Sequence, residues 1–247
     1  MDFEGRVAVV TGASSGIGRA TSELLAARGA HVALVARSRG RLEEVQSGIR
    51  QKGGSATVIP ADLTDLAQIE ALGARVGESL GGADILVNAA GAWHDSERQF
   101  KGPPLEQTPA EQIEHLFAVE LRATIHLTRV LLPVMKARGR GKIVNLSCGF
   151  AGPHEGKGWV HYYVANEGVA AFTRALAAEV READIQVNAV APWFVRSEAV
   201  VRFFPEESKT AVETGDVARL AVFLASSEAA HISGQVVEIR SRRDVGP

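Results

Sequence analysis

The sequence lacks the features that mark several large classes of protein. Its one cysteine, Cys148, cannot form an intramolecular disulfide, and the paired cysteines of zinc sites are missing. No apolar run approaches the roughly 18 residues that cross a bilayer, and the amino terminus lacks the basic-then-apolar layout of a secretory signal. The 27 basic and 29 acidic residues nearly balance, which gives no electrostatic reason to expect nucleic acid as a partner. We therefore expect a soluble, cytoplasmic protein without a membrane or nucleic-acid partner.

What the sequence does contain is an alternation of short apolar runs and helical patterns. The runs are rich in Val, Ile and Ala, without polar alternation, which is typical of parallel strands covered by helices on both faces. They are Val7–Thr11, His31–Ala36, Ala56–Ala61, Asp84–Asn88, Lys142–Leu146, Gln186–Ala191 and Gln235–Ile239. The helical patterns between them are Gly18–Arg28, Arg39–Lys52, Asp65–Leu80, Pro109–Arg138, Val160–Glu182 and Gly215–Ser226.

This alternation predicts an α/β fold of the Rossmann type, with one doubly wound parallel sheet. No linker separates independent cores, so we expect a single domain spanning residues 1–247. Two variable, irregular segments, Ala92–Thr108 and Arg196–Thr214, interrupt the pattern. Ligands bind outside the carboxyl ends of the strands in such sheets, where loops of this kind would form walls.

A glycine-rich segment follows the first strand and opens a helix. It reads Thr11-Gly12-Ala13-Ser14-Ser15-Gly16-Ile17-Gly18. Gly12 would permit a tight turn, Gly16 a close approach of backbone to a pyrophosphate, and Gly18 close packing of helix on strand. The free N–H groups and positive dipole end of the helix would hold the phosphates. A plain glycine-rich turn is the alternative, but the strand before and the helix after favour a dinucleotide site formed by Gly12, Ser14, Ser15, Gly16, Ile17 and Gly18.

The end of the second strand distinguishes between the two nicotinamide dinucleotides. It reads Ala36-Arg37-Ser38-Arg39 and offers no acidic residue for a ribose 2′-hydroxyl. A guanidinium with a hydroxyl suits a 2′-phosphate, so Arg37 and Ser38 favour NADP(H) over NAD(H). In the alternative interpretation, Arg37, Arg39 and Arg41 are solvated residues of the first turn of the next helix.

Four motifs together resemble the short-chain dehydrogenase/reductase family. They are Thr11–Gly18, the turn Asp62-Leu63-Thr64-Asp65, the strand end Asn88-Ala89-Ala90-Gly91, and Val187-Asn188-Ala189-Val190-Ala191-Pro192. The resemblance covers the chain from Gly5 to about Ile239. It implies a single domain with a seven-stranded parallel sheet, a nicotinamide dinucleotide cofactor, and a homodimer or homotetramer.

The resemblance also implies which residues contact the cofactor. Asp62 and Leu63 are expected beside the adenine, and Asn88, Ala89 and Ala90 along the ribose. Taken alone, Asp62 could equally cap a helix, and Asn88 could form a strand-end turn. The family's Pro-Gly after the sixth strand is here Pro192-Trp193, and the next residues resemble its cofactor-contacting stretch, which includes Val195 and Ser197. The Trp193 indole would stack over a ring, fill the nicotinamide space, or pack into the core beside the sixth strand.

The catalytic set that the family uses is mostly replaced. By resemblance, Tyr162 is the proton donor, while Asn166 stands at the lysine position and Glu120 at the asparagine position, on the long middle helix. Cys148 stands at the serine position, with Ser147 one residue before it and Gly149 as an alternative. Tyr162 and Asn166 would also contact the cofactor. Because Asn166 carries no charge, we expect the pKa of Tyr162 to stay near about 10, and an inward-pointing Glu120 to raise it further.

These observations predict an NADP(H)-binding oxidoreductase that acts on a small carbonyl or alcohol with an altered acid–base set. A non-catalytic, cofactor-bound scaffold or sensor is one alternative, and a non-redox lyase or dehydratase using Tyr162 is another. His161, beside Tyr162, is a further hypothetical base. Nothing in the spacing indicates a metal site.

Overall fold

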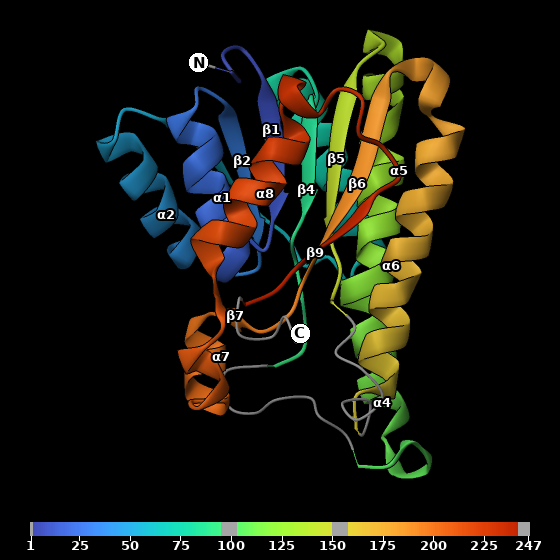
Figure 1. The fold of residues 1–247 in the computed structure, drawn as a ribbon. Coiled ribbons are helices and arrows are strands. Elements are labelled where there is room, and N and C mark those ends of the chain that lie inside the picture. Colours follow the sequence, from blue (N-terminus) through green and yellow to red (C-terminus); the bar gives the residue numbers. More distant parts are fainter. Residues whose placement is uncertain (1, 95–102, 150–157, 242–247) are drawn as a thin grey trace.

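The computed structural model describes residues 2–94, 103–149 and 158–241 and contains the predicted parallel sheet (Figure 1). Its seven strands lie in the order β3-β2-β1-β4-β5-β6-β9. The strands are β1 (Val7–Thr11), β2 (His31–Ala36), β3 (Ser55–Pro60), β4 (Ile85–Asn88), β5 (Gly141–Leu146), β6 (Ile185–Pro192) and β9 (Val236–Ile239). The strand order reverses direction between β1 and β4, which is the point where ligands bind in doubly wound sheets.

Helices cover both faces of the sheet, as the apolar strands require. One face carries α1 (Gly16–Ala27), α2 (Arg39–Gln51) and α8 (Thr214–Ala225), and the other carries α3 (Leu66–Leu80), α5 (Ala123–Arg138) and α6 (Val160–Glu179). Successive residues of a strand point to opposite faces, so Val10 packs under α1 and α8 while Val9 joins the core of the other layer. The prediction of a doubly wound α/β sheet is confirmed.

Two of the predicted segments differ from the structure. The continuous helix expected over Pro109–Arg138 is instead α4 (Ala110–Leu116), a π-helical segment, η2 (Phe117–Arg122), and then α5. The wider turn of a π-helix changes which side chains face inward, and it is here that Glu120 becomes buried.

The segment expected to be irregular, Arg196–Thr214, is partly regular. It contains the end of β7 (Val195–Arg196), a short helix α7 (Glu198–Phe203) and the whole of β8 (Val212–Glu213), and β7 pairs with β8. Of the other variable segment, residues 95–102 lie outside the described residues. Short turns of other helix types complete the fold: η1 (Leu105–Gln107), η3 (Arg181–Ala183), η4 (Glu207–Lys209) and η5 (Ser227–Ala229).

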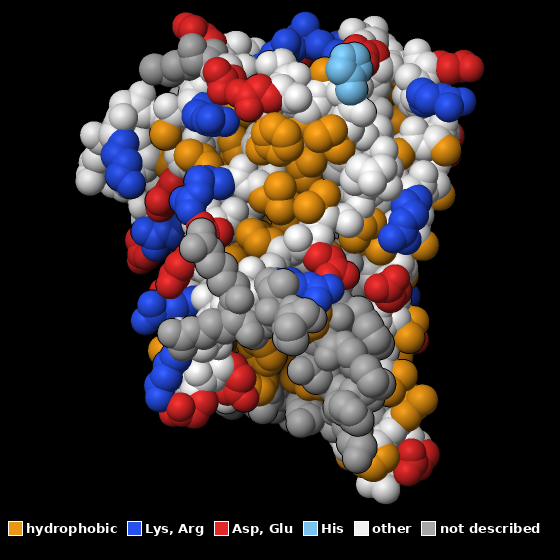
Figure 2. Space-filling model, in the orientation of Figure 1, with side chains coloured by type: hydrophobic (Ala, Val, Ile, Leu, Met, Phe, Trp, Pro, Cys, Tyr) orange, Lys and Arg blue, Asp and Glu red, His pale blue; other side chains and the backbone are white. Residues whose placement is uncertain are grey.

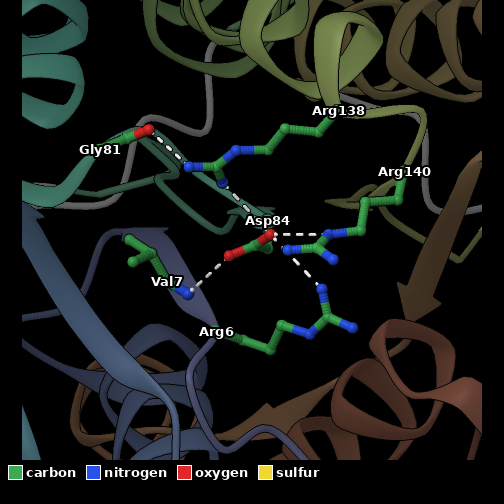
Figure 3. A network of polar contacts seen from close by, with 6 residues as sticks. All are labelled: Arg6, Val7, Gly81, Asp84, Arg138 and Arg140. Atoms are coloured by element: carbon green, nitrogen blue, oxygen red, sulfur yellow. Dashed lines mark hydrogen bonds and ion pairs between the residues drawn. The ribbon is translucent and has the colours of Figure 1, made fainter.

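A charged network ties three neighbouring strands together at the amino-terminal edge of the sheet (Figure 3). The buried Asp84 carboxylate accepts a hydrogen bond from Val7 N at 3.0 Å. It also accepts from Arg138 Nη1 at 3.2 Å and from Arg140 Nε at 3.3 Å, and it pairs with Arg6 Nη1 at 3.6 Å. Removing one partner of such a buried group costs more than the pair contributes, so the network holds the edge opposite the candidate site in place. Within the described ranges, we find no helix with the length and apolar character of a membrane span.

Candidate functional site

The predicted phosphate cradle lies at the carboxyl end of β1, at the switch point of the sheet. Gly12 has φ +64°, and a Cβ there would lie 2.5 Å from the backbone oxygen of Ala89; a Cβ on Gly18 would lie 2.4 Å from the oxygen of Gly12. Both positions therefore require glycine. The Ser15 side chain makes no capping hydrogen bond to α1, so the first N–H groups of that helix keep their capacity for an anion. These residues fit the pyrophosphate of a dinucleotide.

Replacing Gly16 with alanine should weaken dinucleotide binding while leaving the fold intact. Gly16 has φ +52°, and a Cβ at this position would meet nothing within 4 Å, so a methyl group would occupy only the space that a pyrophosphate needs. Gly53→Ala is the matched control, because Gly53 has φ +81° and equally open surroundings but lies after α2. Both variants should lose about 1 kcal/mol of stability, and only Gly16→Ala should lose about tenfold or more in NADP(H) affinity by calorimetry. Equal affinities would contradict the cradle.

The ends of β1 and β4 are joined by a residue to which the sequence patterns gave no separate role. Thr11 Oγ1 accepts hydrogen bonds from Ala89 N at 2.9 Å and from Ala90 N at 3.0 Å. These hydrogen bonds hold Ala89 and Ala90, which are expected along the cofactor ribose, against the end of β1 where the phosphate cradle begins. A buried hydroxyl that ends an apolar strand was the available signal.

The Asn88 side chain belongs to a buried network below that segment. Its amide donates to Asn145 Oδ1 at 2.8 Å and to Thr128 Oγ1 at 3.3 Å, and Asn145 in turn donates to Thr173 Oγ1 at 2.9 Å. The amide of Asn88 is thus turned toward β5 and α5. Asn145 was missed, although a polar residue inside the apolar β5 run is the kind of signal that marks such a network.

Near the expected adenine of the cofactor, the polar side chains are exposed or hydrogen-bonded within their own turn. Asp62 Oδ1 accepts from Thr64 N at 2.9 Å, forming a turn, and Asp65 rather than Asp62 caps α3. Leu63, between them, is buried. Arg37 and Ser38 are exposed at the end of β2. Arg37 makes no hydrogen bond or ion pair with any other residue of the described part of the chain.

Three of the residues predicted to contact the cofactor lie at the end of β6 and just after it. Pro192 ends β6 and Val195 is buried in β7. Ser197 Oγ accepts from Val200 N at 3.2 Å and so caps α7. These residues lie at or after the carboxyl end of β6, and their contact with the cofactor stays a prediction.

The Trp193 indole packs at the ends of β5 and β9. A Cβ on Gly149 would lie 2.2 Å from Trp193 Cδ1. The guanidinium of Arg240 lies 4.2 Å from the centre of the ring, and Trp193 Nε1 donates to Glu238 Oε2 at 3.4 Å. These contacts match the packing alternative stated for Trp193.

Tyr162 and Asn166 lie one turn apart near the start of α6. Part of the Tyr162 ring is exposed, whereas its hydroxyl is buried and hydrogen-bonded to the Cys148 side chain. Asn166 is buried, and its amide donates to the Tyr162 backbone oxygen at 3.0 Å. Ser147 Oγ donates to the Asn166 backbone oxygen at 2.9 Å. Of the three residues considered for the serine position, Cys148 therefore contacts the phenol, the Ser147 hydroxyl bonds the helix backbone, and Gly149 has no side chain to offer.

Another side chain that acts on the Tyr162 hydroxyl is Glu120, from the π-helical segment η2. Its Oε1 accepts a hydrogen bond from Ala92 N at 2.7 Å, just beyond the end of β4. Burial raises the pKa of Glu120 from its ordinary 4.5 to about 7, although the bond from Ala92 works in the opposite direction. A carboxyl group with this pKa changes its charge near neutral pH.

The surroundings of Tyr162 keep its phenol protonated. Burial raises the pKa of Tyr162 well above its ordinary value of 10.0, and the charges of Cys148 and Glu120 add to this effect. Among the described residues, no lysine or arginine lowers it. Glu120 is thus turned inward, which is the case in which the sequence led us to expect a further rise in this pKa. His161 is also buried, with Nε2 3.1 Å from Gln112 Nε2.

A doubly wound parallel sheet with a glycine cradle at its switch point defines a dinucleotide-binding α/β protein. The family model for short chain dehydrogenases matches residues 6–208. The chain is 32% identical over 262 residues to D-beta-hydroxybutyrate dehydrogenase of Rhizobium meliloti (strain 1021), covering 95% of this chain and 96% of the relative.

Solved structures agree with this match. Levodione reductase superposes with a TM-score of 0.88 at 27% identity, covering 99% of this chain and 100% of the other. A chain from Beutenbergia cavernae, assigned as an NAD(P)-dependent gluconate 5-dehydrogenase and holding NADP at low occupancy, has a TM-score of 0.85 at 31% identity, covering 95% of each chain. The chain belongs to the short-chain dehydrogenase/reductase family, a family of oxidoreductases that bind nicotinamide dinucleotides.

Proposed function

We propose that this protein is an NADP(H)-dependent oxidoreductase that works in the direction of carbonyl reduction. The observation that carries the proposal is the buried Tyr162 hydroxyl, hydrogen-bonded to Cys148, at the edge of the sheet where the dinucleotide cradle lies. A reductase needs a neutral donor for the substrate oxygen, whereas alcohol oxidation needs a phenolate, which burial disfavours. The cofactor supplies the hydride when bound. The names of the relatives, a dehydrogenase of D-beta-hydroxybutyrate and a levodione reductase, agree with carbonyl and alcohol chemistry.

In this proposal each predicted side chain has a defined task. Tyr162 donates its proton to the carbonyl oxygen, and Cys148 orients the phenol through their hydrogen bond. Glu120 changes its charge near pH 7 beside the phenol. Asn166 fixes the backbone of this turn of α6, and Ser147 supports it from β5.

Tyr162→Phe tests the proton donor. The variant should reduce kcat/KM for NADPH-dependent ketone reduction by about 10²–10⁴-fold, because a positioned acid is lost, while NADPH affinity stays within a factor of two or so. Absorbance of NADPH with a panel of ketones and aldehydes measures the rate, and calorimetry measures the affinity. Equal rates in the parent and the variant would remove Tyr162 from the mechanism.

Arg37→Ala tests the cofactor preference. Losing a charge-assisted pair with the 2′-phosphate should weaken NADPH binding by about 10- to 100-fold and leave NADH binding unchanged. Arg41→Ala is the matched control, since Arg41 is also exposed on the first turn of α2. Equal losses for NADPH and NADH, or an equal effect in the control, would assign Arg37 to the solvated surface.

A non-catalytic role as an NADP(H)-bound scaffold or sensor is the second candidate. It is favoured by the absence of a lysine or arginine that acts on Tyr162 among the described residues. This candidate predicts NADPH binding without turnover of any carbonyl. A non-redox lyase, which would use Tyr162 or Glu120 for proton transfer, predicts turnover that does not depend on added cofactor.

The expected homodimer or homotetramer and the cytoplasmic location stay predictions. Hydrophobic side chains gather over and beside α8 (Figure 2), where Leu220 and Phe223 are only partly buried. An apolar face of this kind supports self-association.

A further inference from the structure

Five aromatic side chains from three separate segments meet below the carboxyl edge of the sheet. Trp93 and His94 follow β4, Phe194 lies between β6 and β7, and Phe203 and Phe204 lie at the end of α7, which Figure 1 shows beyond that edge. We call these five residues the aromatic wall. The centre of the Trp93 ring lies 6.2 Å from that of Phe203 and 6.1 Å from that of Phe204, and Phe194 lies 5.5 Å from Phe204. These separations fall in the range where aromatic rings attract one another.

The rings of the aromatic wall are not fully buried by their mutual contacts. Phe194 is 37% exposed, and the other four are half-buried. Each large ring gains by complete removal from water. The wall therefore keeps apolar ring surface that a further ring could cover.

One end of the aromatic wall is attached directly to the group around Tyr162. Ala92 N donates to Glu120 Oε1 at 2.7 Å, and Trp93 is the next residue. The charge of Glu120 is also one of the causes that raise the pKa of Tyr162.

The Phe194 end of the aromatic wall is connected to the same group through the segment that follows β5. The Trp193 ring packs against Gly149, and Gly149 N donates to Pro192 O at 2.9 Å. Gly149 follows Cys148, the partner of Tyr162, and Phe194 follows Trp193. Each end of the wall is thus next in sequence to a residue that contacts this group: Trp93 follows Ala92, which donates to Glu120, and Phe194 follows Trp193, which packs against Gly149.

We propose that the aromatic wall binds the aryl ring of the substrate, so that the protein reduces aryl ketones or aryl aldehydes rather than small aliphatic keto acids. This inference rests on the proposed function, since it names the substrate class of the same site. An aryl ring gains ring–ring attraction beyond the area it buries, which a saturated ring of the same size does not. The buried Glu120 carboxyl, once ionised, repels a second carboxylate at this place.

The test measures ketone binding to the protein saturated with NADP⁺, which cannot reduce the probe. Calorimetry compares acetophenone, 1-cyclohexylethanone and acetoacetate. We expect acetophenone to bind about three- to tenfold more tightly than 1-cyclohexylethanone, the affinity equivalent of one ring–ring contact, and acetoacetate to bind more weakly than both.

Variants separate the aromatic contribution from general apolar burial. Phe194→Leu and Phe204→Leu should each remove the advantage of acetophenone and leave 1-cyclohexylethanone affinity nearly unchanged. Phe172→Leu, on α6 and outside the wall, is the control and should preserve the advantage. Since Phe194 is the most exposed of the five, its variant serves if Phe204→Leu fails to fold.

The outcomes distinguish this inference from the function on which it rests. If NADP⁺ binds but acetophenone shows no advantage, or if the advantage survives in the folded leucine variants, the aryl site is overturned and the proposed function stands. Tighter binding of acetoacetate overturns it as well. If NADP⁺ itself does not bind, both the proposed function and the aryl site fail.

Discussion

Asn166→Lys should raise the rate of NADPH-dependent carbonyl reduction by about 10- to 100-fold. Asn166 lies one turn from Tyr162 on α6 and is buried, and no lysine or arginine among the described residues acts on the phenol. An ammonium group within about 4–6 Å lowers the pKa of a neighbouring acid by about 1–3 units. A stronger acid transfers its proton to the carbonyl oxygen more readily. The rate is measured as kcat/KM with NADPH and a ketone between pH 6 and 9.

Asn166→Met is the matched control for this prediction. Methionine approaches the length of lysine but carries no charge, so it should give no gain. A gain in both variants would show that side-chain length rather than charge matters at residue 166. If the folded lysine variant binds NADPH and is no faster than the parent, the missing cation does not limit the chemistry. A gain from an inactive parent would identify a dormant hydride-transfer site and favour the scaffold function for the natural chain.

The cradle could be predicted from the sequence because its requirements are local. Gly12 and Gly18 lie six residues apart, and the turn between strand and helix dictates both of them. The spacing of Tyr162 and Asn166 is local in the same sense, because residues four apart share a helix face. The apolar strands were likewise found within one residue of their observed ends, since most of them are buried on both faces.

Contacts between distant segments could not be predicted in this way. Thr11 meets Ala89 and Ala90 only because β1 pairs with β4, 78 residues further on. Whether Ser147 or Cys148 contacts the phenol depends on how β5 ends against α6. Neither residue type nor spacing specifies that geometry.

The orientation of Glu120 was the least accessible feature. Its side chain is buried in the π-helical segment Phe117–Arg122, and the pattern of this region indicated one continuous α-helix. A π-helical segment inserts extra residues into a helix without a residue type that marks it, although such segments are frequent at functional sites. The charge of the site near neutral pH therefore depends on a local irregularity that only the structure reveals.

Because the π-helical segment buries Glu120, the stability of the protein should depend on pH. Burial raises the pKa of Glu120 from 4.5 to about 7. The folded chain thus binds the proton more tightly than the unfolded chain does, so this group's contribution to stability is fully present below about pH 4.5 and is lost as the pH rises to about 7. A difference of roughly 2.5 pKa units corresponds to about 3 kcal/mol in the free energy of unfolding.

Glu120→Gln should therefore stabilise the protein at pH 8 by about 1–3 kcal/mol and change it little at pH 5. Glutamine stays neutral and keeps an oxygen that can accept the hydrogen bond from Ala92 N, while its second amide hydrogen reduces the gain. Urea denaturation at the two pH values measures the effect. Glu114→Gln, which removes an exposed carboxylate paired with Arg122 on the surface, is the control and should change stability by less than about 1 kcal/mol.

The same variant shows how Glu120 acts on the reaction. If the carboxylate only raises the pKa of Tyr162, the parent rate falls as the pH rises through 7, and Glu120→Gln removes this fall and gains about three- to tenfold in kcat/KM at pH 8. If Glu120 instead supplies the proton itself, the variant is slower below about pH 7, because an amide cannot replace a carboxylic acid as a donor, and the difference shrinks at higher pH as the parent's Glu120 ionises. We expect the first result, since Cys148, rather than Glu120, is the side chain hydrogen-bonded to Tyr162, whereas Glu120 accepts its bond from Ala92 N. A loss of rate that is largest below about pH 7, where Glu120 is protonated, would transfer the role of donor from Tyr162 to Glu120.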